Sequence, residues 1–273
     1  MTKIIIALIH NNDKKRNDYL YPMLDKLKKA LSKKSKVEVV KISEQPKIHF
    51  QDTLVTIVRK CFLWKINREW LSYREIKSRP YFVDIPILLL RCVRVYLQRV
   101  SENRRFGIDV SVTYKHTKAW ETFLEKKADI LICFEDDVVF KKDSVSRMES
   151  LLSEIEKVGN KPIYLDLAGG LDNSFIRTEK LLVKTKKDYK YYKKPVTNTS
   201  CGYMINQKTA EEFKSVLIKF PWFRGLPIDW LVNKIFISTV SKRYHCFHTE
   251  PTVFNHGSLT GNYSSWLWYN NSK

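Results

Sequence analysis

Two continuous apolar runs, residues 4–9 and 130–134, constrain the fold of this chain more than any other feature. Neither run shows the polar alternation of a half-exposed strand, so each predicts a strand buried on both faces. Helical spacing follows the first run over residues 19–31 and precedes the second over residues 118–127. This alternation predicts the α/β class, with a mostly parallel central sheet flanked by helices. Further strands are expected at 37–42, 163–167 and 202–205, and further helices at 144–158, 209–218 and 230–240.

The chain length suits one elaborated domain, and we predict a single domain over residues 1–273. Hydrophobic residues (44%) and charged residues (29%) occur at levels usual for soluble globular proteins, which argues against a disordered chain. The 49 Lys and Arg against 29 Asp and Glu give a formal charge of +20. This charge favours a polyanionic partner, which the composition leaves open as nucleic acid, anionic lipid or a phosphorylated substrate.

Residues 45–105 differ from the rest of the chain, because aromatic side chains are interleaved there with Arg and Lys. We predict a helical insertion within the domain. Its segments 57–65 and 85–100 combine apolar and basic residues, which suits helices that lie on an anionic membrane surface. The alternative is that these helices pack on the domain core while their cationic ends reach water. Residues 184–194, with their lysines and tyrosines, predict an exposed hairpin or loop.

The cysteine pattern and the hydropathy predict a cytoplasmic protein. Five cysteines without a CxxC pair indicate free thiols in a reducing compartment. Residues 4–9 are too short for the core of a signal peptide, and no stretch approaches the ~18 apolar residues of a membrane span. We therefore expect any membrane contact to be peripheral, on the inner face of the membrane.

The strongest chemical signal is the acidic motif Glu135-Asp136-Asp137, which interrupts an apolar run at the end of a predicted strand. Adjacent carboxylates repel one another and are costly to desolvate unless a cation neutralises them. Ligands of open α/β sheets bind at this edge, and oxygen ligands suit Mg²⁺ or Mn²⁺, which can bridge a diphosphate. The alternative is a solvated acidic turn between two strands.

The order of several motifs resembles glycosyltransferase family 25, the lipooligosaccharide and collagen galactosyltransferase group. The family has a glycine, a serine and a histidine ahead of a helix, and then a strand that ends in Glu-Asp-Asp. Downstream it has a small-residue segment before a Tyr-containing strand, and a Pro-x-Asp pattern. The matching residues here are Gly107, Ser111 and His116, the helix with Ala119-Trp120, the acidic motif, the segment from Asn198 to Ala210 with Tyr203, and Pro227-Ile228-Asp229.

The resemblance implies a GT-A-type fold and a hexosyltransferase that moves a sugar, such as galactose, from a nucleotide sugar to a saccharide or lipid-linked acceptor. It implies UDP-galactose as an example of the donor, Mn²⁺ or Mg²⁺ as cofactor, and inversion in one displacement. Lipopolysaccharide, capsule or other glycan biosynthesis is the setting. Asp137 is implied as the principal metal ligand, with Glu135 or Asp136 helping to hold the metal or the donor ribose. The N-terminal donor-binding residues of the family are echoed by His10, Asn11 and Arg16.

The C-terminal half supplies further candidates beside the family pattern. Many GT-A enzymes add a C-terminal histidine to the metal site, and His256, followed by Gly257 and donor-binding candidate Ser258, is the best match. The resemblance implies Asp229 as the leading catalytic base and as an acceptor-binding residue, although capping of the following helix explains it equally well. Asp166 is an acceptor-binding candidate, and a turn acid is the alternative.

Two other functions are consistent with parts of the sequence. A nucleic-acid-binding or nuclease-like protein would use the +20 charge and the metal-capable acids, but the chain lacks a helix-turn-helix, zinc-finger or RNP-type signature. A noncatalytic membrane-associated scaffold would not need the intact acids. The segment His245-Cys246-Phe247-His248 lacks the second ligand cluster of a zinc site.

Overall fold

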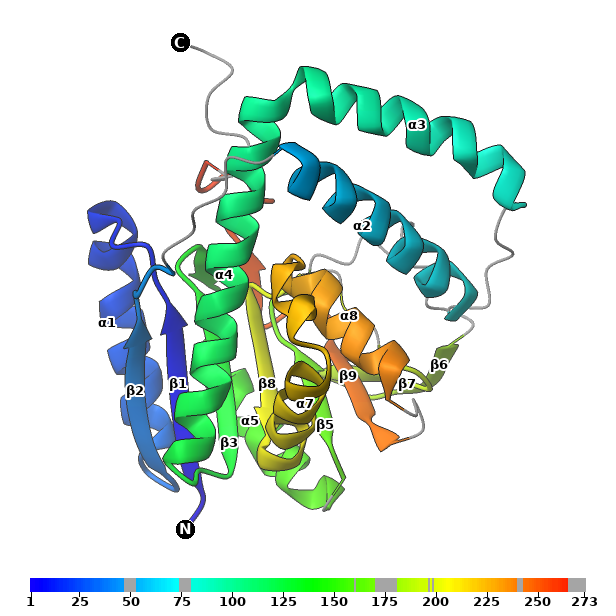
Figure 1. Cartoon of the computed structure of the whole chain (residues 1–273). Helices are drawn as coiled ribbons and strands as arrows, with labels where there is room; N and C mark the ends of the chain where they lie inside the picture. The colour runs from blue at the N-terminus through cyan, green and yellow to red at the C-terminus, as the bar shows by residue number, and fades with distance from the viewer. Residues whose placement is uncertain are drawn as a thin grey trace.

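The computed structural model describes residues 1–46, 53–73, 80–159, 161–169, 181–195, 197, 199–239 and 243–264. Helices cover both faces of a central sheet, which confirms the predicted α/β class (Figure 1). The described strands are β1 (Lys3–Ile9), β2 (Lys36–Ile42), β3 (Ile130–Glu135), β4 (Val138–Phe140), β5 (Ile163–Asp166), β6 (Leu182–Thr185), β7 (Tyr189–Tyr192), β8 (Gly202–Asn206), β9 (His245–Thr249) and β10 (Phe254–His256). The described helices are α1 (Lys14–Leu31), α2 (Thr53–Tyr73), α3 (Tyr81–Leu97), α4 (Arg99–Glu125), α5 (Ser144–Ile155), α7 (Gln207–Lys219) and α8 (Ile228–Ser238), with 3-10 turns at Glu156–Val158 and Pro221–Gly225.

The central sheet is mixed in direction. Its strand order is β2-β1-β3-β8-β5-β9-β7-β6. β1 runs parallel to both β2 and β3, and β5 runs parallel to β9, whereas β8 lies antiparallel between β3 and β5. The carboxyl ends of β1 and β3 therefore meet at one edge of the sheet, which is where the loops that follow them can form a joint site.

The alternation of side chains along β1 explains the two helical layers. Ile5 and Ile9 join a core with Trp120 of α4 and the apolar sides of α7 and α8, while Ile4 and Ile6 join a second core formed with α1 and α5. A strand that buries both rows of side chains has no polar face, which is why residues 4–9 read as a continuous apolar run.

Two helices begin well before the residues at which their apolar spacing predicts a start. α1 begins at Lys14 rather than near residue 19, because the Asp13 side chain caps it by accepting a hydrogen bond from the Arg16 backbone N–H at 3.0 Å. α4 begins at Arg99 rather than at 118, so that Gly107, Ser111 and His116 lie on one long helix. This helix connects the outer helices to the centre of the molecule (Figure 1).

Residues of the predicted insertion form α2 and α3 and the first turns of α4. α2 packs against α4 and α8, and α3 packs on the far side of α2, so the insertion adds a helical layer at one end of the sheet (Figure 1). None of the helices in the described part of the chain combines the length and apolar character that a membrane span requires. All five cysteines are free thiols, although the Sγ atoms of Cys61 on α2 and Cys92 on α3 lie 3.8 Å apart.

The segment 184–194 is a hairpin, as predicted, but the expectation that it lies outside the core is wrong for one of its strands. β7 pairs with β9 and thereby joins the central sheet, while β6 forms the exposed outer strand. Tyr189 and Tyr192 of β7 are buried, and their rings make edge-to-face contacts with Phe247 and His248 of β9. Tyr189 and Tyr192 lie three residues apart and therefore on opposite faces of β7, while Lys190 between them is half-buried and pairs with Glu250.

Candidate active site

The acidic motif lies where β3 ends. Glu135 is the last residue of β3, Asp136 and Asp137 form the turn, and β4 begins at Val138. The loop after β1 reaches the same place, since the Asn11 backbone N–H donates to Asp136 Oδ2 at 3.0 Å. The turn is not a solvated surface feature, because Asp136 and Asp137 are only 4% and 5% exposed. The three acids therefore need compensation within the protein.

Asp136 is compensated by an arginine. Arg16, in the first turn of α1, donates from Nη1 to Asp136 Oδ1 at 2.5 Å, and both side chains are buried. The second nitrogen of the guanidinium donates to the Ser264 carbonyl at 2.9 Å, and the Tyr263 ring lies under it. Burial raises the pKa of Asp136, and Arg16 opposes the rise. This ion pair ties α1 and the C-terminal segment to the acidic turn.

Asp137 is surrounded by a different set of groups. His256 Nε2 lies 3.1 Å from Asp137 Oδ2, the Ser258 hydroxyl donates to the same oxygen, and the Cys201 thiol donates to Oδ1 at 3.4 Å. Burial acts to raise the pKa of Asp137, but His256 and Ser258 outweigh it and hold the pKa at about 2. Asp137 is therefore a carboxylate at neutral pH even in its buried position.

The C-terminal segment reaches Asp137 through a second small sheet. β10 pairs antiparallel with β4, so that His256 lies opposite Val138. Beyond β10, the Gly257 N–H donates to the Asp137 carbonyl at 2.8 Å. A Cβ at Gly257 would lie 2.6 Å from that carbonyl oxygen and 2.4 Å from the Tyr263 ring, so only glycine fits. The glycine thus allows close approach to the backbone of Asp137.

Glu135 is held from α4 and from the loop before β8. Its Oε1 accepts from the Ser200 hydroxyl at 2.6 Å and lies 3.2 Å from His116 Nε2, while His116 Nδ1 lies 3.0 Å from the Tyr203 hydroxyl. Burial lowers the pKa of His116, but the contacts with Cys133 and Glu135 raise it to about 9. His116 therefore supports the charge of Glu135 from behind the site.

Lys115 is a buried side chain behind the acidic turn that the sequence analysis did not single out. It is fully buried, and its Nζ donates to the His10 carbonyl at 2.7 Å and to Asn11 Oδ1 at 2.6 Å. Burial lowers its pKa, and the charge of Asp136 opposes the fall. Its neighbour His116 was part of the family pattern. The burial of Lys115 could not be predicted, because a lysine among polar residues of a helix can point inward or outward.

The acidic turn opens into a pocket of about 770 Å³ between the sheet edge and α4. The predicted site residues on its wall are Asn11, Arg16, Glu135, Asp136, Asp137, Asp229, His256 and Ser258. They are joined by residues that were not predicted as site residues, including Arg104, Asp109, Ser111, Thr199 and Ser200. The volume suits a ligand larger than a single sugar ring.

Asp229 lies on the pocket wall in the first turn of α8 and is partly exposed to the pocket. Desolvation by its surroundings raises its pKa to about 7, while the backbone N–H of Trp230 lowers it and the charges of Asp109 and Glu135 add to the rise. A carboxyl group with this pKa can exchange a proton near neutral pH, which a helix cap does not require.

Two predicted residues do not lie on the pocket wall. The His10 side chain is buried against Asn12, Asn17 and Tyr21, and only its backbone carbonyl faces Lys115. Asp166 is 1% exposed, and its carboxylate accepts from the Gly169 backbone N–H at 2.7 Å. The geometry of Asp166 is that of a turn acid, the alternative that the sequence left open. The neighbouring Gly170 and the family-pattern residue Asn198 lie outside the described residues.

The residues around Asp137 fit a divalent cation. Among the described residues, Asp137, Cys201 and His256 offer ligand atoms that all lie within 4.8 Å of one another, whereas the predicted ligand Glu135 is not part of this group. The Nδ1 atom of His256 is buried without a hydrogen-bond partner. Carboxylate and imidazole together suit Mn²⁺ better than Mg²⁺, which prefers oxygen alone. Burial raises the pKa of the Cys201 thiol well above its usual value, so the thiol is protonated without a metal.

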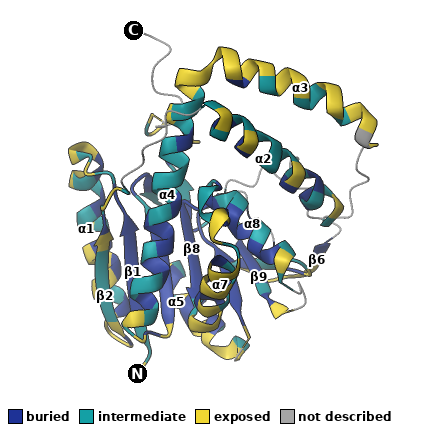
Figure 2. Ribbon diagram, in the orientation of Figure 1, coloured by how far each residue is buried: buried dark blue, intermediate teal, exposed yellow. Residues whose placement is uncertain are grey.

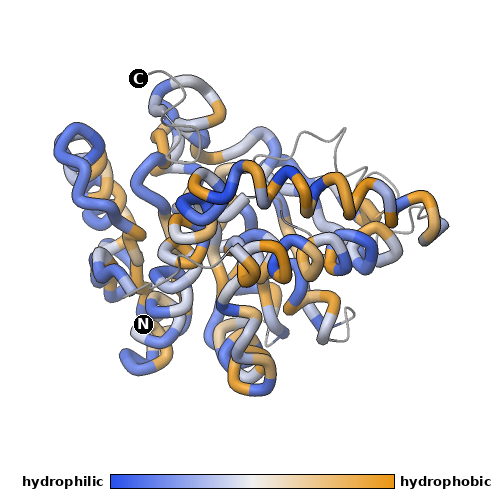
Figure 3. The backbone as a smooth tube through the Cα atoms, turned by 45° about the horizontal axis from the view of Figure 1, so that its top comes forward, coloured by the Kyte–Doolittle hydropathy of each residue, from blue (hydrophilic) through white to orange (hydrophobic). Residues whose placement is uncertain are grey.

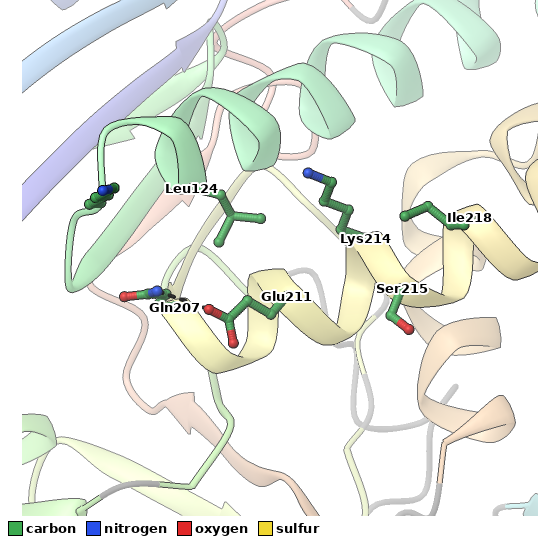
Figure 4. Close-up of a pocket in the computed structure, with 7 residues that line it drawn as sticks. Leu124, Gln207, Glu211, Lys214, Ser215 and Ile218 are labelled. Carbon is green, nitrogen blue, oxygen red and sulfur yellow. Dashed lines mark hydrogen bonds between the residues drawn. The ribbon is translucent and has the colours of Figure 1, made fainter.

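A second groove of about 700 Å³ lies between the end of α4 and α7 (Figure 4). Gln207 donates to Glu211 at 2.8 Å on its wall, and Leu124, Lys214 and Ile218 face it. Asn206, which precedes Gln207, pairs with Ile130 at the opposite end of β3 from the acidic turn. The groove is therefore remote from the acids, and the candidate active site is the pocket at Asp137.

Comparison with known proteins matches part of the chain to a protein family. Residues 113–232 match the model of glycosyltransferase family 25 (LPS biosynthesis protein). Over these residues the chain is similar to family 25. The matched range includes the acidic motif and Asp229, and it leaves Arg16 and His256 outside. In a search of curated proteins, no sequence matches this one. The family match supports a glycosyltransferase in lipopolysaccharide biosynthesis and favours that function over a nucleic-acid-binding one.

Proposed function

We propose that this chain is a metal-dependent GT-A-type hexosyltransferase that moves a sugar from a nucleotide sugar to a saccharide acceptor. The observation that carries the proposal is the meeting of Asp137 with His256 and Ser258 on the wall of the pocket. Three segments far apart in the sequence supply these groups and Arg16 to one turn. A buried carboxylate with a pKa near 2 beside an imidazole is a favourable place for a divalent cation.

Each acid of the motif has its own task in this proposal. Asp137 and His256 hold Mn²⁺ or Mg²⁺, which when bound offsets the negative charge of the departing nucleoside diphosphate. Ser258 fixes the carboxylate of Asp137 by its hydrogen bond. Asp136 holds Arg16 in place, and Glu135 keeps one carboxylate oxygen towards His116 and Ser200. Glu135 thus acts on the donor from the pocket wall rather than as the principal metal ligand.

The nucleotide sugar, with UDP as the proposed nucleotide, binds across the sheet edge. Asn11, Arg16, Glu135, Asp136 and Ser258 support this part of the proposal, because all five line the same pocket. The guanidinium of Arg16 is already paired with Asp136, so Arg16 contributes positive potential as well as any direct contact. His10 contributes through its backbone, which accepts from Lys115.

Asp229 is the proposed general base. Its position on the pocket wall and its pKa of about 7 suit a group that accepts the proton of the attacking acceptor hydroxyl. The oxygen of that hydroxyl then forms the new bond to the anomeric carbon as the bond to the diphosphate breaks. A single displacement of this kind inverts the configuration, and no covalent intermediate is needed.

The proposed acceptor is a saccharide of lipopolysaccharide or another glycan, free or linked to lipid. A cytoplasmic enzyme that contacts the inner face of the membrane would meet such acceptors during their synthesis. The net charge of +20 supports this location, since the inner leaflet is anionic.

A donor screen tests the proposal. Purified protein is mixed with a panel of nucleotide sugars, with and without Mn²⁺, and binding and slow donor hydrolysis are measured. We expect one nucleotide to stabilise the protein only when Mn²⁺ is present. Tight binding of nucleic acid with no response to any nucleotide sugar would contradict the proposal and restore its rival.

A further inference from the structure

The outermost helix presents its apolar side chains to solvent. Figure 2 shows α3 as largely exposed, in contrast to the helices that cover the sheet. Five large apolar residues of α3 are between 56% and 74% exposed: Phe82, Leu89, Leu90, Val93 and Leu97. They recur at intervals of one, three, four and seven residues, which is the spacing of one helix face. Exposed apolar stripes of this length mark interaction surfaces.

The acidic and the basic residues of α3 differ in their exposure. Its acidic residue, Asp84, faces inward and pairs with Arg68 of α2. Arg91, Arg94 and the following Arg99 are exposed. The Arg94 guanidinium donates to Gln98 at 3.0 Å, and that of Arg99 lies over the Tyr96 ring. The outward surface of α3 therefore combines an apolar stripe with cations.

The sequence analysis treated the segments of α2 and α3 alike, but the two helices differ in their surroundings. α2 lies between α3 and the rest of the protein, and its Phe62 and Leu63 pack on the core beside the sheet. α2 therefore packs on the core, as the alternative in the sequence analysis had it, while α3 carries the exposed apolar stripe. Figure 3, in which this end of the molecule comes forward, shows hydrophobic segments along the outer helices.

We propose that the exposed face of α3 docks on an anionic lipid bilayer. An apolar stripe with basic neighbours lies in the interface of such a membrane, with the apolar side chains among the acyl chains and the arginines near the phosphates. The net charge of +20 provides long-range attraction to the same surface. Charge complementarity selects lipid over a second copy of this chain, whose α3 face would present cations to cations.

This docking places the pocket near the lipid surface. α4 begins at Arg99, immediately after α3, and Arg104, Gly107 and Ile108 in its next turns line the pocket. A lipid-linked acceptor could then reach Asp229 without leaving the membrane. The membrane proposal itself does not depend on the proposed transferase activity, because vesicle binding needs neither donor nor metal.

Vesicle sedimentation at low salt tests the docking surface. The intact chain is mixed with vesicles of phosphatidylglycerol and phosphatidylcholine, and with vesicles of phosphatidylcholine alone. We expect binding to the anionic vesicles, weak binding to the neutral ones, and loss of binding at high salt. Leu90→Ser and Leu97→Ser should each weaken the binding about tenfold or more. Ile218→Ser on α7 is the matched control, because Ile218 is 69% exposed and lies off α3.

The arginines are tested in the same assay. Changing Arg91, Arg94 and Arg99 to Gln should weaken binding roughly 100-fold, whereas changing Lys26, Lys28 and Lys29 on α1 to Gln removes the same charge elsewhere and should weaken it less. Circular dichroism verifies that each variant is folded. Equal binding by wild type and both leucine variants overturns the proposal. The proposal is also overturned if no protein binds vesicles and sedimentation velocity shows a wild-type dimer that is lost in the leucine variants.

Discussion

The acidic pocket buries charged side chains and the α3 surface exposes apolar ones, and both arrangements are the opposite of what is usual in a folded protein. The pocket and the residues behind it bury carboxylates, a lysine and an arginine, and these charges have specific partners, such as Arg16 for Asp136 and the His10 carbonyl for Lys115. α3 exposes large apolar side chains such as Leu90 and Leu97, which are mostly in contact with solvent rather than with other side chains. A buried charge is stable only when its partner lies at the right distance, whereas an exposed apolar side chain needs no such partner. Substitutions in the two regions should therefore have different consequences.

The largest effect is expected at Asp229. Asp229→Asn removes the proposed base, and we expect the transfer rate to fall roughly 10²- to 10⁴-fold. In the wild-type enzyme, kcat/KM should rise with pH through about 7, because Asp229 must be deprotonated to accept a proton. The raised pKa also means that ionised Asp229 disfavours the folded state above pH 7, so Asp229→Asn should melt no lower than wild type at pH 8. A flat pH profile between 6 and 8 would remove Asp229 as the base.

The next effect is on stability. Asp136→Asn leaves the buried guanidinium of Arg16 without its ion pair, and we expect the free energy of unfolding to fall by about 3–5 kcal/mol. Urea denaturation measures the loss. Asp143→Asn, a change in the residue before α5, is the control and should stay within about 0.5 kcal/mol of wild type. Equal stability of both variants would mean that Arg16 and Asp136 are not paired in solution.

A smaller effect is expected for the histidine beside Asp137. His256→Ala should weaken Mn²⁺ binding about 10- to 100-fold while leaving the fold intact, because the imidazole lies at the edge of the core. Calorimetric titration with Mn²⁺ measures the change. His245→Ala on β9 serves as the control, since His245 stacks on Tyr191 and is not a pocket residue. If both variants bind Mn²⁺ as wild type does, His256 is a structural residue.

The smallest effect is expected on the stability of α3 variants. Leu90→Ser and Leu97→Ser expose no new core surface, so the free energy of unfolding should change by less than about 0.5 kcal/mol. Thermal melting of both variants checks this value. A large loss of stability would show that these side chains pack on the protein, and it would remove the contrast between α3 and the pocket.

Those parts of the fold that rest on apolar runs could be predicted from sequence. Buried runs fixed β1 and β3, and a charge cluster at the end of one of them located the acidic turn. The direction of β8 could not be read, because an apolar run carries no information on whether its neighbours run parallel or antiparallel. The start of α4 was also missed, since Thr113, Lys115 and His116 are polar yet buried and so hide the helical period.

Site residues could be predicted where their residue types match a known motif, but not where their place in the site depends on packing. Asp137 and His256 could be proposed as partners from their residue types, and the structure brings them together through β4 and β10. Cys201 could not, because its thiol reaches Asp137 only when β8 is placed beside β3. The sequence left Asp166 open between an acceptor-binding residue and a turn acid, because its position at a strand end does not reveal that the Gly169 backbone N–H donates to its carboxylate.

The measurement that tests the central claim most directly is the binding of Mn²⁺ and UDP to wild type and to Asp137→Asn. The account predicts that wild type binds one Mn²⁺ per chain, that UDP tightens this binding, and that Asp137→Asn loses the site while it still folds. The carboxylate is the charged ligand of the site, so its removal should weaken the binding by about 100-fold or more. Equal Mn²⁺ and UDP affinity in the two folded proteins would contradict the assignment of the acidic turn as a metal-dependent donor site.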